Sequence, residues 1–204
     1  MPPEIGQLAT LKWLDLAKNQ LSSLPPEIGQ LTALERFDIG GNQLSDLPAE
    51  IGQLTGLEVL DLSRNQLHSL PPEIGQLAAL RLLFLNNNRL SALPDEICRL
   101  KALQFLRLED NQLGVLPLAV CGLAALEELN IGGNQLRALP PEIGRLRRLT
   151  ELNLDNNQIG TLPHEIRRLT ALSSLTLSKN ELRALPQDIC QLTSLAFLNV
   201  AGTN

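Results

Sequence analysis

Apolar and polar residues recur along the chain in a fixed pattern of 23 positions, which reads L-x-x-L-x-L-x-x-N-x-L-x-x-L-P-x-E-I-x-x-L-x-x. No insertion or deletion interrupts this pattern, and it covers essentially the whole chain. A period of this length is typical of repeat proteins, in which each unit forms one supersecondary element and the units stack. The opening leucines of units one to nine are Leu11, Leu34, Leu57, Leu80, Leu103, Leu126, Leu149, Leu172 and Leu195.

The first part of each unit predicts a short β-strand. In the stretch LEVLDLSRNQL of the third unit, apolar and polar residues alternate with a period of two, as in a strand with one buried face. We therefore expect Leu60 and Leu62 to point into the core, and Val59, Asp61 and Ser63 to point away from it.

The second part of each unit predicts a short helix. In LPPEIGQLAAL, Leu70, Ile74, Leu77 and Leu80 follow one another at helical spacing and share one face. Proline suits the first turn of a helix, and the glutamate that follows lies near the positive end of the helix dipole. The glycine after the isoleucine, as at Gly75, indicates a helix that is short and partly 3₁₀.

Stacking lets such units share one hydrophobic core and pair their strands in a parallel sheet. Neighbouring strands lie roughly 4.8 Å apart, whereas helical segments need about twice that room. We therefore expect a curved stack whose strands line the inner face. Asparagine at the ninth position should satisfy backbone groups where the chain leaves each strand, a structural role that we favour over a ligand-binding one. These asparagines are Asn19, Asn42, Asn65, Asn88, Asn111, Asn134, Asn157 and Asn180.

The L-x-x-L-x-L-x-x-N-x-L segment and its L-P-x-E-I-x-x-L tail resemble the leucine-rich repeat family, in eight successive matches over the full chain. The 23-residue version is similar to the class found in bacterial proteins, Roco-type GTPases, Ras-binding scaffolds and plant intracellular Ras-group-related proteins. The resemblance implies an α/β fold: a right-handed horseshoe solenoid with a parallel β-sheet on the concave face and short helical or 3₁₀ segments on the convex face. It also implies that protein partners bind to the concave face.

The repeat predicts a single domain over residues 1–204, with eight full 23-residue repeats and partial units at both ends. The chain opens within a unit at Pro2, and Thr203 stands where asparagine is expected. Terminal units of solenoids normally carry a polar outer face. Because no caps are recognisable, we expect a fragment of a longer protein, or ends that are covered by self-association.

Composition narrows the function classes. The chain is 44% apolar and 19% charged, which fits a folded domain with a core. Its net charge of -5 and pI of about 5.1 argue against nucleic-acid binding. No apolar run approaches the roughly 20 residues of a membrane span, and no secretory signal precedes the repeats. We expect a cytoplasmic protein, with a secreted bacterial effector as the alternative.

The sequence contains no motif for a phosphate loop, a dinucleotide site or a zinc protease. His68 and His164 occupy different positions of the unit, so we expect surface residues and no enzyme, cofactor or metal site. Cys98, Cys121 and Cys190 all occupy the nineteenth position, where glycine is usual. We expect free thiols that fill packed positions, and whether Cys98 and Cys121 are ever bridged stays open.

Positions that vary while the frame repeats carry the function of a repeat protein. Asp15, Asp38 and Asp61 form an acidic ladder in the first three units, from which a sheet gains nothing because like charges on neighbouring strands repel. Apolar and basic residues gather beside this ladder in units three to five, which is typical of a binding hot spot. The predicted partner-binding residues are Asp15, Asp38, Val59, Asp61, Arg64, Leu82, Phe84, Phe105 and Arg107.

A second cluster lies on the predicted outer side. We interpret it as a solvated ridge, and the alternative is contact with an acidic domain, anionic lipid or nucleic acid. The cluster consists of Arg145, Arg147, Arg148, Arg167 and Arg168.

These observations predict a non-enzymatic scaffold, acting in signalling, that binds a protein partner on its concave face. The alternative is the recognition domain of a larger signalling enzyme or bacterial effector, such as a Roco-type GTPase, a kinase or a ubiquitin ligase. A third hypothesis is an extracellular sensor of small ligands. Irregular units such as LPLAVCGL argue against an artificial consensus array.

Overall fold

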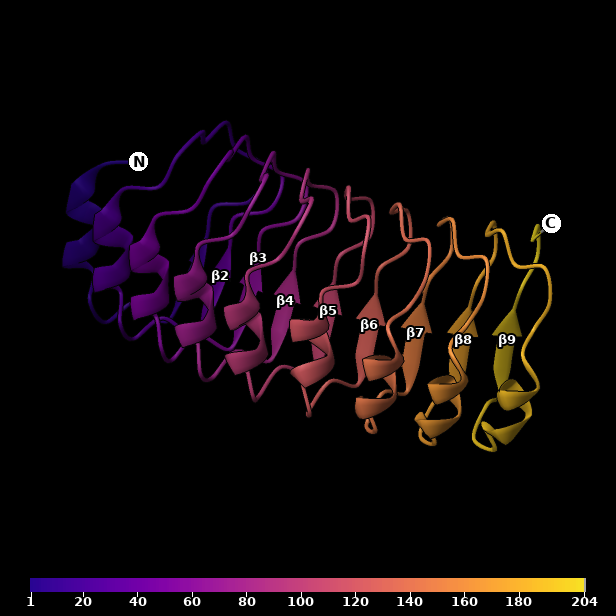
Figure 1. The fold of residues 1–204 in the computed structure, drawn as a ribbon. Helices are drawn as coiled ribbons and strands as arrows, with labels where there is room; N and C mark the ends of the chain where they lie inside the picture. Colours follow the sequence, from indigo (N-terminus) through magenta and orange to yellow (C-terminus); the bar gives the residue numbers. More distant parts are fainter. Residues whose placement is uncertain (204) are drawn as a thin grey trace.

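The computed structural model describes residues 1–203, which form one continuous stack of similar units (Figure 1). Each strand pairs in parallel with the next one along the chain, so a single sheet runs from one end of the stack to the other. The predicted leucine-rich repeat solenoid is confirmed. The strands are β1 (Trp13–Asp15), β2 (Arg36–Asp38), β3 (Val59–Asp61), β4 (Leu82–Phe84), β5 (Phe105–Arg107), β6 (Glu128–Asn130), β7 (Glu151–Asn153), β8 (Ser174–Thr176) and β9 (Phe197–Asn199).

The strands follow the predicted alternation of buried and open side chains. Each strand covers the third to fifth positions of its unit, and equal positions face each other across the sheet, as Asp38 faces Asp61. Leu60 and Leu62 are fully buried, whereas Val59 and Asp61 are half-buried on the opposite face. The register therefore turns each variable position into a row of side chains across the open face.

Each unit also contains a five-residue 3₁₀ helix preceded by a proline in extended conformation. The helix ends at a leucine whose N–H donates to the isoleucine carbonyl, as Leu54 does to Ile51 at 3.2 Å. The predicted short helix is thus 3₁₀ throughout. The helices are η1 (Pro3–Gln7), η2 (Pro26–Gln30), η3 (Ala49–Gln53), η4 (Pro72–Gln76), η5 (Asp95–Arg99), η6 (Leu118–Gly122), η7 (Pro141–Arg145), η8 (His164–Arg168) and η9 (Gln187–Gln191).

Glycine at the nineteenth position lets neighbouring 3₁₀ helices approach closely. A Cβ on Gly52 would lie 2.6 Å from the carbonyl oxygen of Glu73 in the next helix, which is closer than real contacts allow. Where Cys121 takes this position, η6 and η7 pack less closely than the helices that carry glycine.

The three cysteines are free thiols, as predicted. The expectation that they fill packed positions is confirmed for Cys121, which is buried, and burial raises the pKa of its thiol to about 11. Cys98 is half-buried. The same expectation is wrong for Cys190, which is exposed because no further helix packs over η9 within residues 1–203.

The ninth-position asparagines form a buried ladder that joins consecutive units. The amide nitrogen of Asn65 donates to the carbonyl oxygens of Ile39 (3.1 Å) and Leu62 (3.2 Å), and its Oδ1 accepts from the Leu44 N–H (3.0 Å). The side chain thus satisfies the Leu44 N–H, which would otherwise be buried without a partner. Each of the two carbonyl oxygens also accepts from a neighbouring asparagine, Ile39 from Asn42 and Leu62 from Asn88, so the ladder is continuous. The predicted structural role is confirmed. Asn42, Asn88, Asn111, Asn134, Asn157 and Asn180 are buried in the same way.

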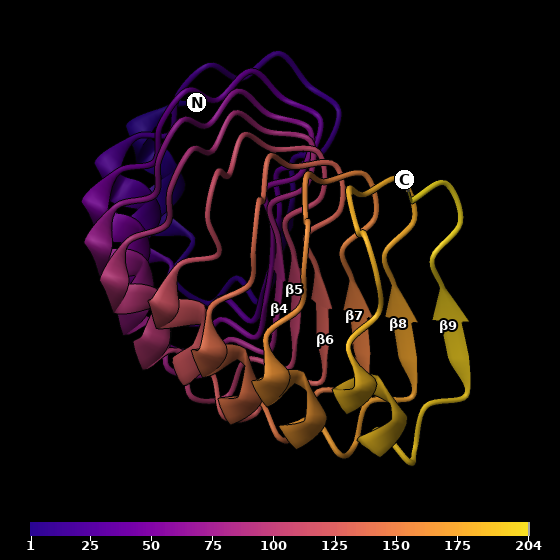
Figure 2. The same cartoon turned by 45° about the vertical axis from the view of Figure 1, so that its right-hand side comes forward.

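A core of leucine and isoleucine separates the strands from the 3₁₀ helices, which lie on opposite sides of the stack (Figure 2). Because the helices take more room than the strands, the stack curves and the sheet lines its concave face. The third- and fifth-position side chains of every unit project from this face. In the part of the chain that the structure describes, no helix is both long and apolar enough to cross a bilayer.

Candidate binding surface on the concave face

The structure brings most of the predicted binding residues together on the open face of the sheet. Phe84 and Phe105 are half-buried and face outward, so neither is part of the core. Asp15 is exposed on β1 and lies apart from the hollows described below. Across the sheet the third-position row runs Val59, Leu82, Phe105, and the fifth-position row runs Asp61, Phe84, Arg107.

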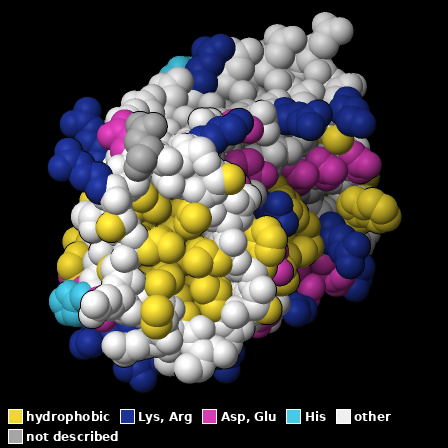
Figure 3. Space-filling view, turned by 90° about the vertical axis from the view of Figure 1, so that its right-hand side faces the viewer, with side chains coloured by type: hydrophobic (Ala, Val, Ile, Leu, Met, Phe, Trp, Pro, Cys, Tyr) yellow, Lys and Arg dark blue, Asp and Glu magenta, His cyan; other side chains and the backbone are white. Residues whose placement is uncertain are grey.

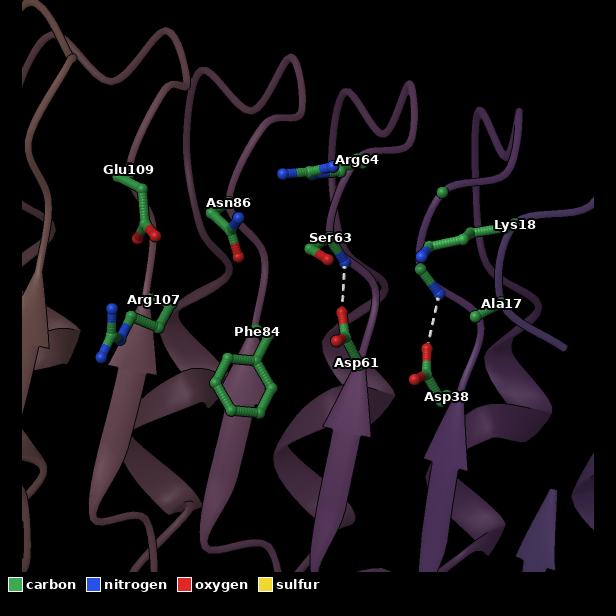
Figure 4. Close-up of a pocket in the computed structure, with 12 residues that line it drawn as sticks. Ala17, Lys18, Asp38, Asp61, Ser63, Arg64, Phe84, Asn86, Arg107 and Glu109 are labelled. Carbon is green, nitrogen blue, oxygen red and sulfur yellow. Dashed lines mark hydrogen bonds between the residues drawn. The ribbon is translucent and has the colours of Figure 1, made fainter. Parts of the chain in front are cut away.

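A hollow of about 580 Å³, here called the upper hollow, opens above these strands and spans units one to five (Figure 4). Strand side chains form its floor and residues of the following turns form its rim. The floor consists of Asp38, Asp61, Phe84 and Arg107, and the rim includes Lys18, Gly40, Gly41, Arg64, Asn86 and Glu109. Five of the nine predicted residues therefore line one space.

Two smaller hollows adjoin the upper hollow on the concave face. The acidic hollow, of about 230 Å³, is lined by Trp13, Arg36, Phe37, Asp38, Val59, Asp61 and Phe84. The apolar hollow, of about 220 Å³, is lined by Arg36, Glu58, Val59, Arg81, Leu82, Gln104 and Phe105. Shared lining residues make the three hollows one continuous, uneven surface.

The aspartates of the ladder have a local structural role that the sequence analysis missed. Oδ1 of Asp38 accepts a hydrogen bond from the Gly40 N–H at 3.0 Å, and Oδ1 of Asp61 accepts one from the Ser63 N–H at 2.8 Å (Figure 4). Each carboxylate thus caps the turn that follows its strand. The expectation that the sheet gains nothing from these residues is wrong, although their mutual repulsion remains.

Three units carry no such cap at the fifth position, and two of them, units four and five, lie at the centre of the predicted site. In unit eight this position holds Thr176, and the Ser178 N–H donates instead to Oδ1 of Asp155 in the preceding unit, at 2.6 Å. Asn130 and Asn153 cap their turns as the aspartates do, through Oδ1. Phe84 and Arg107 occupy the same position and carry no acceptor atom. Residues that break a local rule of the fold are expected at functional sites. The substitution of a cap by an aromatic and a basic side chain therefore marks units four and five.

Arg107 is held between two acidic side chains. Its Nη2 pairs with Oε1 of Glu128 at 2.5 Å. Its Nε and the Oε2 of Glu109 are buried without a hydrogen-bond partner. Burial raises the pKa of the Glu109 carboxyl group, and this effect outweighs the opposing effects of the Glu109 backbone N–H and of Arg107. Polar atoms at this end of the upper hollow thus have unused hydrogen-bonding capacity, which a partner could satisfy.

The rim of the upper hollow contains strained backbone. Lys18 (φ 56°) and Arg64 (φ 53°) adopt the left-handed conformation at the eighth position of their units, where Gly41 (φ 69°) stands between them. Gly41 suits this position because glycine adopts the left-handed conformation without steric cost. A Cβ on Gly40 would lie 3.1 Å from a carboxylate oxygen of Asp61, so this glycine keeps the space between the aspartates open.

The acidic ladder gives this face a distinct electrostatic character. On the strand side, at the right of Figure 3, a band of acidic side chains runs beside basic and hydrophobic ones. Burial raises the pKa of Asp38, and the charges of Asp61 and Asp15 add to this effect, against the lowering by the Gly40 N–H and Lys18. The raised pKa shows that the free protein carries the Asp38 charge at an energetic cost.

Several residues of this surface were not predicted as binding residues. Trp13 is 63% exposed and lines the acidic hollow, and it is the only tryptophan of the chain. Its outward third position was a usable signal, because exposed tryptophan is enriched at interfaces. Glu109 and Lys18 lie at the seventh and eighth positions of their units, after the three-residue strand has ended. Their contribution depends on how the turn folds back over the sheet.

The remaining candidates lie elsewhere. His68 and His164 are exposed, as predicted, and His164 contacts Glu165 at 2.9 Å. The five arginines of the convex cluster are exposed, and Arg167 lies 3.6 Å from Asp188. Among the described residues, no group of three or more His, Cys, Asp or Glu side chains is arranged to hold a metal ion.

Sequence profiles identify the repeat directly. The profile described as "Leucine rich repeat" matches residues 9–67 and 147–204, and the one described as "Leucine-rich repeat region" matches residues 59–155. No curated protein sequence matches the chain significantly.

Solved structures give the same result. A leucine-rich repeat protein from Leptospira interrogans is 42% identical, with a TM-score of 0.96, over 98% of this chain and 51% of its own. The ectodomain of the plant membrane receptor kinase GASSHO1/SCHENGEN3 from Arabidopsis thaliana, solved in complex with Casparian strip integrity factor 2, is 33% identical, with a TM-score of 0.75, over 98% of this chain and 28% of its own. Internalin C2 from Listeria monocytogenes shares the fold at 23% identity, with a TM-score of 0.84, over 97% of this chain and 91% of its own.

The chain thus spans about half the length of the Leptospira protein. The chain belongs to the leucine-rich repeat family.

Proposed function

We propose that the chain is a protein-interaction module that holds an extended segment of a protein partner on the concave face of units one to five. One observation carries this proposal: Phe84 and Arg107 stand in place of turn-capping residues and line the upper hollow, and Phe84 also lines the adjoining acidic hollow. The free fold gains nothing from an aromatic ring half-exposed beside a carboxylate. A partner that covers the ring would supply the missing burial.

The geometry of the sheet supports recognition through side chains. Every strand from β2 to β8 is paired on both sides, so its backbone cannot accept an additional strand. Five strands at roughly 4.8 Å spacing make a surface roughly 20 Å wide, and the upper hollow of about 580 Å³ exceeds the volume of one side chain. An extended segment that inserts several side chains fits such a surface.

The comparisons support this class of function. The plant receptor ectodomain was solved in complex with a named factor, and it shares 33% identity with this chain. Leucine-rich repeat domains commonly act as non-enzymatic interaction scaffolds, and the fold of this chain is that of the Leptospira leucine-rich repeat protein.

The test is selection of random dodecapeptides displayed on phage against the wild-type protein. Peptides that bind the proposed surface should lose binding at least about a hundredfold in the Phe84→Ala, Phe105→Ala double variant, because two anchor side chains are removed. Phe197→Ala is the control, because Phe197 lies on β9 at the third position of its unit, as Phe105 does on β5, and its side chain is 54% exposed. Selected peptides that bind the double variant as well as the wild type would overturn the proposed site.

A second candidate is the recognition domain of a larger signalling protein, and it uses the same surface. The chain spans only 28% of the plant receptor kinase ectodomain and 51% of the Leptospira protein, which favours it. Determining the full-length gene sequence on both sides of residues 1–204 separates the two candidates, because an adjoining kinase, GTPase or ligase domain would establish the second.

A further inference from the structure

We propose that the partner segment presents an arginine or lysine side chain to the acidic hollow, between Asp38 and Asp61, and an apolar side chain to the apolar hollow. This inference rests on the proposed function and specifies the chemistry of its partner. It follows from what the two aspartates do in the free protein and from what surrounds them.

The turns do not require the charges of Asp38 and Asp61. Asn130, Asn153 and Asn199 occupy the same position, and the Oδ1 of each accepts the same hydrogen bond from the backbone N–H two residues on, at 3.2, 2.9 and 3.1 Å. An uncharged amide therefore serves the turn. In the first units the chain instead places two carboxylates opposite each other on neighbouring strands, where they repel.

The negative charge at this position is also not neutralised within the chain. Acidic side chains nearby are paired, as Glu35 is with Lys12 at 2.7 Å and Glu128 with Arg107. Neither Asp38 nor Asp61 has a cation within salt-bridge distance among the described residues. Lys18, Arg36 and Arg64 line the neighbouring walls without forming such a pair. A cationic side chain of the partner would neutralise the charge of the two carboxylates.

The walls of the acidic hollow suit a cationic side chain. Trp13 and Phe84 lie on β1 and β4, on either side of the two aspartates on β2 and β3. Aromatic faces attract ammonium and guanidinium groups, and the attraction increases when water is excluded. Carboxylates then provide the charge-assisted hydrogen bonds. The combination distinguishes a basic side chain from a neutral one of equal size.

The apolar hollow determines which second side chain the partner must present beside the basic one. It shares Val59 and Arg36 with the acidic hollow, and Leu82 and Phe105 complete its apolar wall. Val59 and Asp61 are two residues apart on β3, which corresponds to roughly 7 Å. The basic and apolar side chains of the extended partner segment must therefore lie on the same side of its backbone, two residues apart.

The first experiment uses two synthetic peptides as probes, acetyl-Gly-Leu-Gly-Arg-Gly-amide and the same peptide with citrulline in place of arginine. Citrulline keeps the shape of arginine and lacks its charge. Amide chemical shifts of the ¹⁵N-labelled protein should move at Asp38–Gly41 and Asp61–Arg64 with the arginine peptide, and the movement should shrink with added salt. Equal shifts with both peptides, or no shifts at these residues, would overturn the inference.

The second experiment uses the Asp38→Asn, Asp61→Asn double variant, which keeps both turn-capping oxygen atoms. It should bind the arginine peptide at least about tenfold more weakly and unfold at an equal or higher temperature than the wild type. Asp15→Asn is the matched control, because Asp15 makes the same turn hydrogen bond (3.0 Å) and lies outside the hollow. If the double variant bound the peptide as well as the wild type, or unfolded at a lower temperature, the two aspartates would serve only to stabilise the turns, and the inference would be wrong.

Phage selection separates failure of this inference from failure of the proposed function. Selected peptides that depend on Phe84 and Phe105 but lack an enriched basic residue would leave the binding surface standing and remove the acidic subsite. Peptides that depend on neither pair of residues would remove both proposals.

Discussion

The concave faces of the two halves of the solenoid are built on the same frame and carry different chemistry. In units six to eight, the fifth position holds Asn130, Asn153 and Thr176, and the Thr176 hydroxyl donates to Oδ1 of Asn153 at 2.7 Å. The hollow on this side, of about 250 Å³, is lined by polar side chains from Glu128 to Thr176. In units one to five, the equivalent positions hold unpaired carboxylates, Phe84 and Arg107. On the strands of one half, neighbouring polar side chains bond to each other, whereas two carboxylates of the other half have no cation within salt-bridge distance among the described residues.

This difference shows how a repeat protein separates stability from recognition. The leucines and asparagines contact neighbouring units, so each must fit the next copy and none varies freely. The third and fifth positions contact solvent or a partner, and substitutions there change the fold little. At Phe84 the side chain cannot even cap the turn that follows. The stability of the free protein does not explain this residue, whereas contact with a partner would. The same frame can therefore present an inert surface and a binding surface side by side.

The largest expected effect tests whether the frame is the same in both halves. Asn65→Ala and Asn157→Ala should each lower the free energy of unfolding by about 2 kcal/mol, because each leaves one buried backbone N–H, that of Leu44 or of Leu136, without its acceptor. Each also removes one of the two asparagine hydrogen bonds at two backbone carbonyl oxygens. Urea denaturation measures both. Asn19→Ala, at an exposed position, should cost less than about 1 kcal/mol. Unequal costs at the two buried sites would show that the frame differs between the halves.

A smaller effect tests whether backbone strain at the rim serves binding. Arg64→Gly and Lys179→Gly remove left-handed non-glycine residues with φ of 53° and 56°, and each should stabilise the protein by up to about 1 kcal/mol. Only Arg64→Gly should weaken peptides selected on the wild-type surface, because Lys179 lies in the other half, away from the upper hollow. If the two substitutions changed peptide binding equally, Arg64 would not be part of the binding site.

The smallest effect concerns pH. The pKa of Asp38 is raised on folding, so the folded state binds its proton more tightly and the ionised side chain is destabilising at neutral pH. Asp38→Asn should therefore stabilise the protein at pH 7 by less than about 1 kcal/mol, since the site is partly exposed. This gain should shrink as the pH falls through the folded-state pKa, and it should vanish below the ordinary value of 3.8. A gain that is constant between pH 7 and pH 3 would contradict this origin.

Much of the binding surface could be predicted because period and alternation fix which way each strand side chain points. Phe84, Phe105 and Leu82 lie on the open face as their positions require. The cap made by Asp38 and the left-handed conformation of Arg64 depend on the path of the turn, which the hydrophobic pattern does not encode.

The sequence alone determined the frame of this protein: the repeat length, the buried leucines, the asparagine ladder and the outward rows of variable residues. It could do so because each unit interacts mainly with its neighbours, so a local pattern repeated at a constant interval specifies the packing. Only the tertiary structure decided which residues share a hollow. Trp13, Asp38, Asp61 and Phe84 come from four units and meet because parallel strands in register place equal positions side by side. Their common environment, with two carboxylates left without a counter-ion between aromatic walls, arises from curvature and turn geometry acting over distances that no single unit spans.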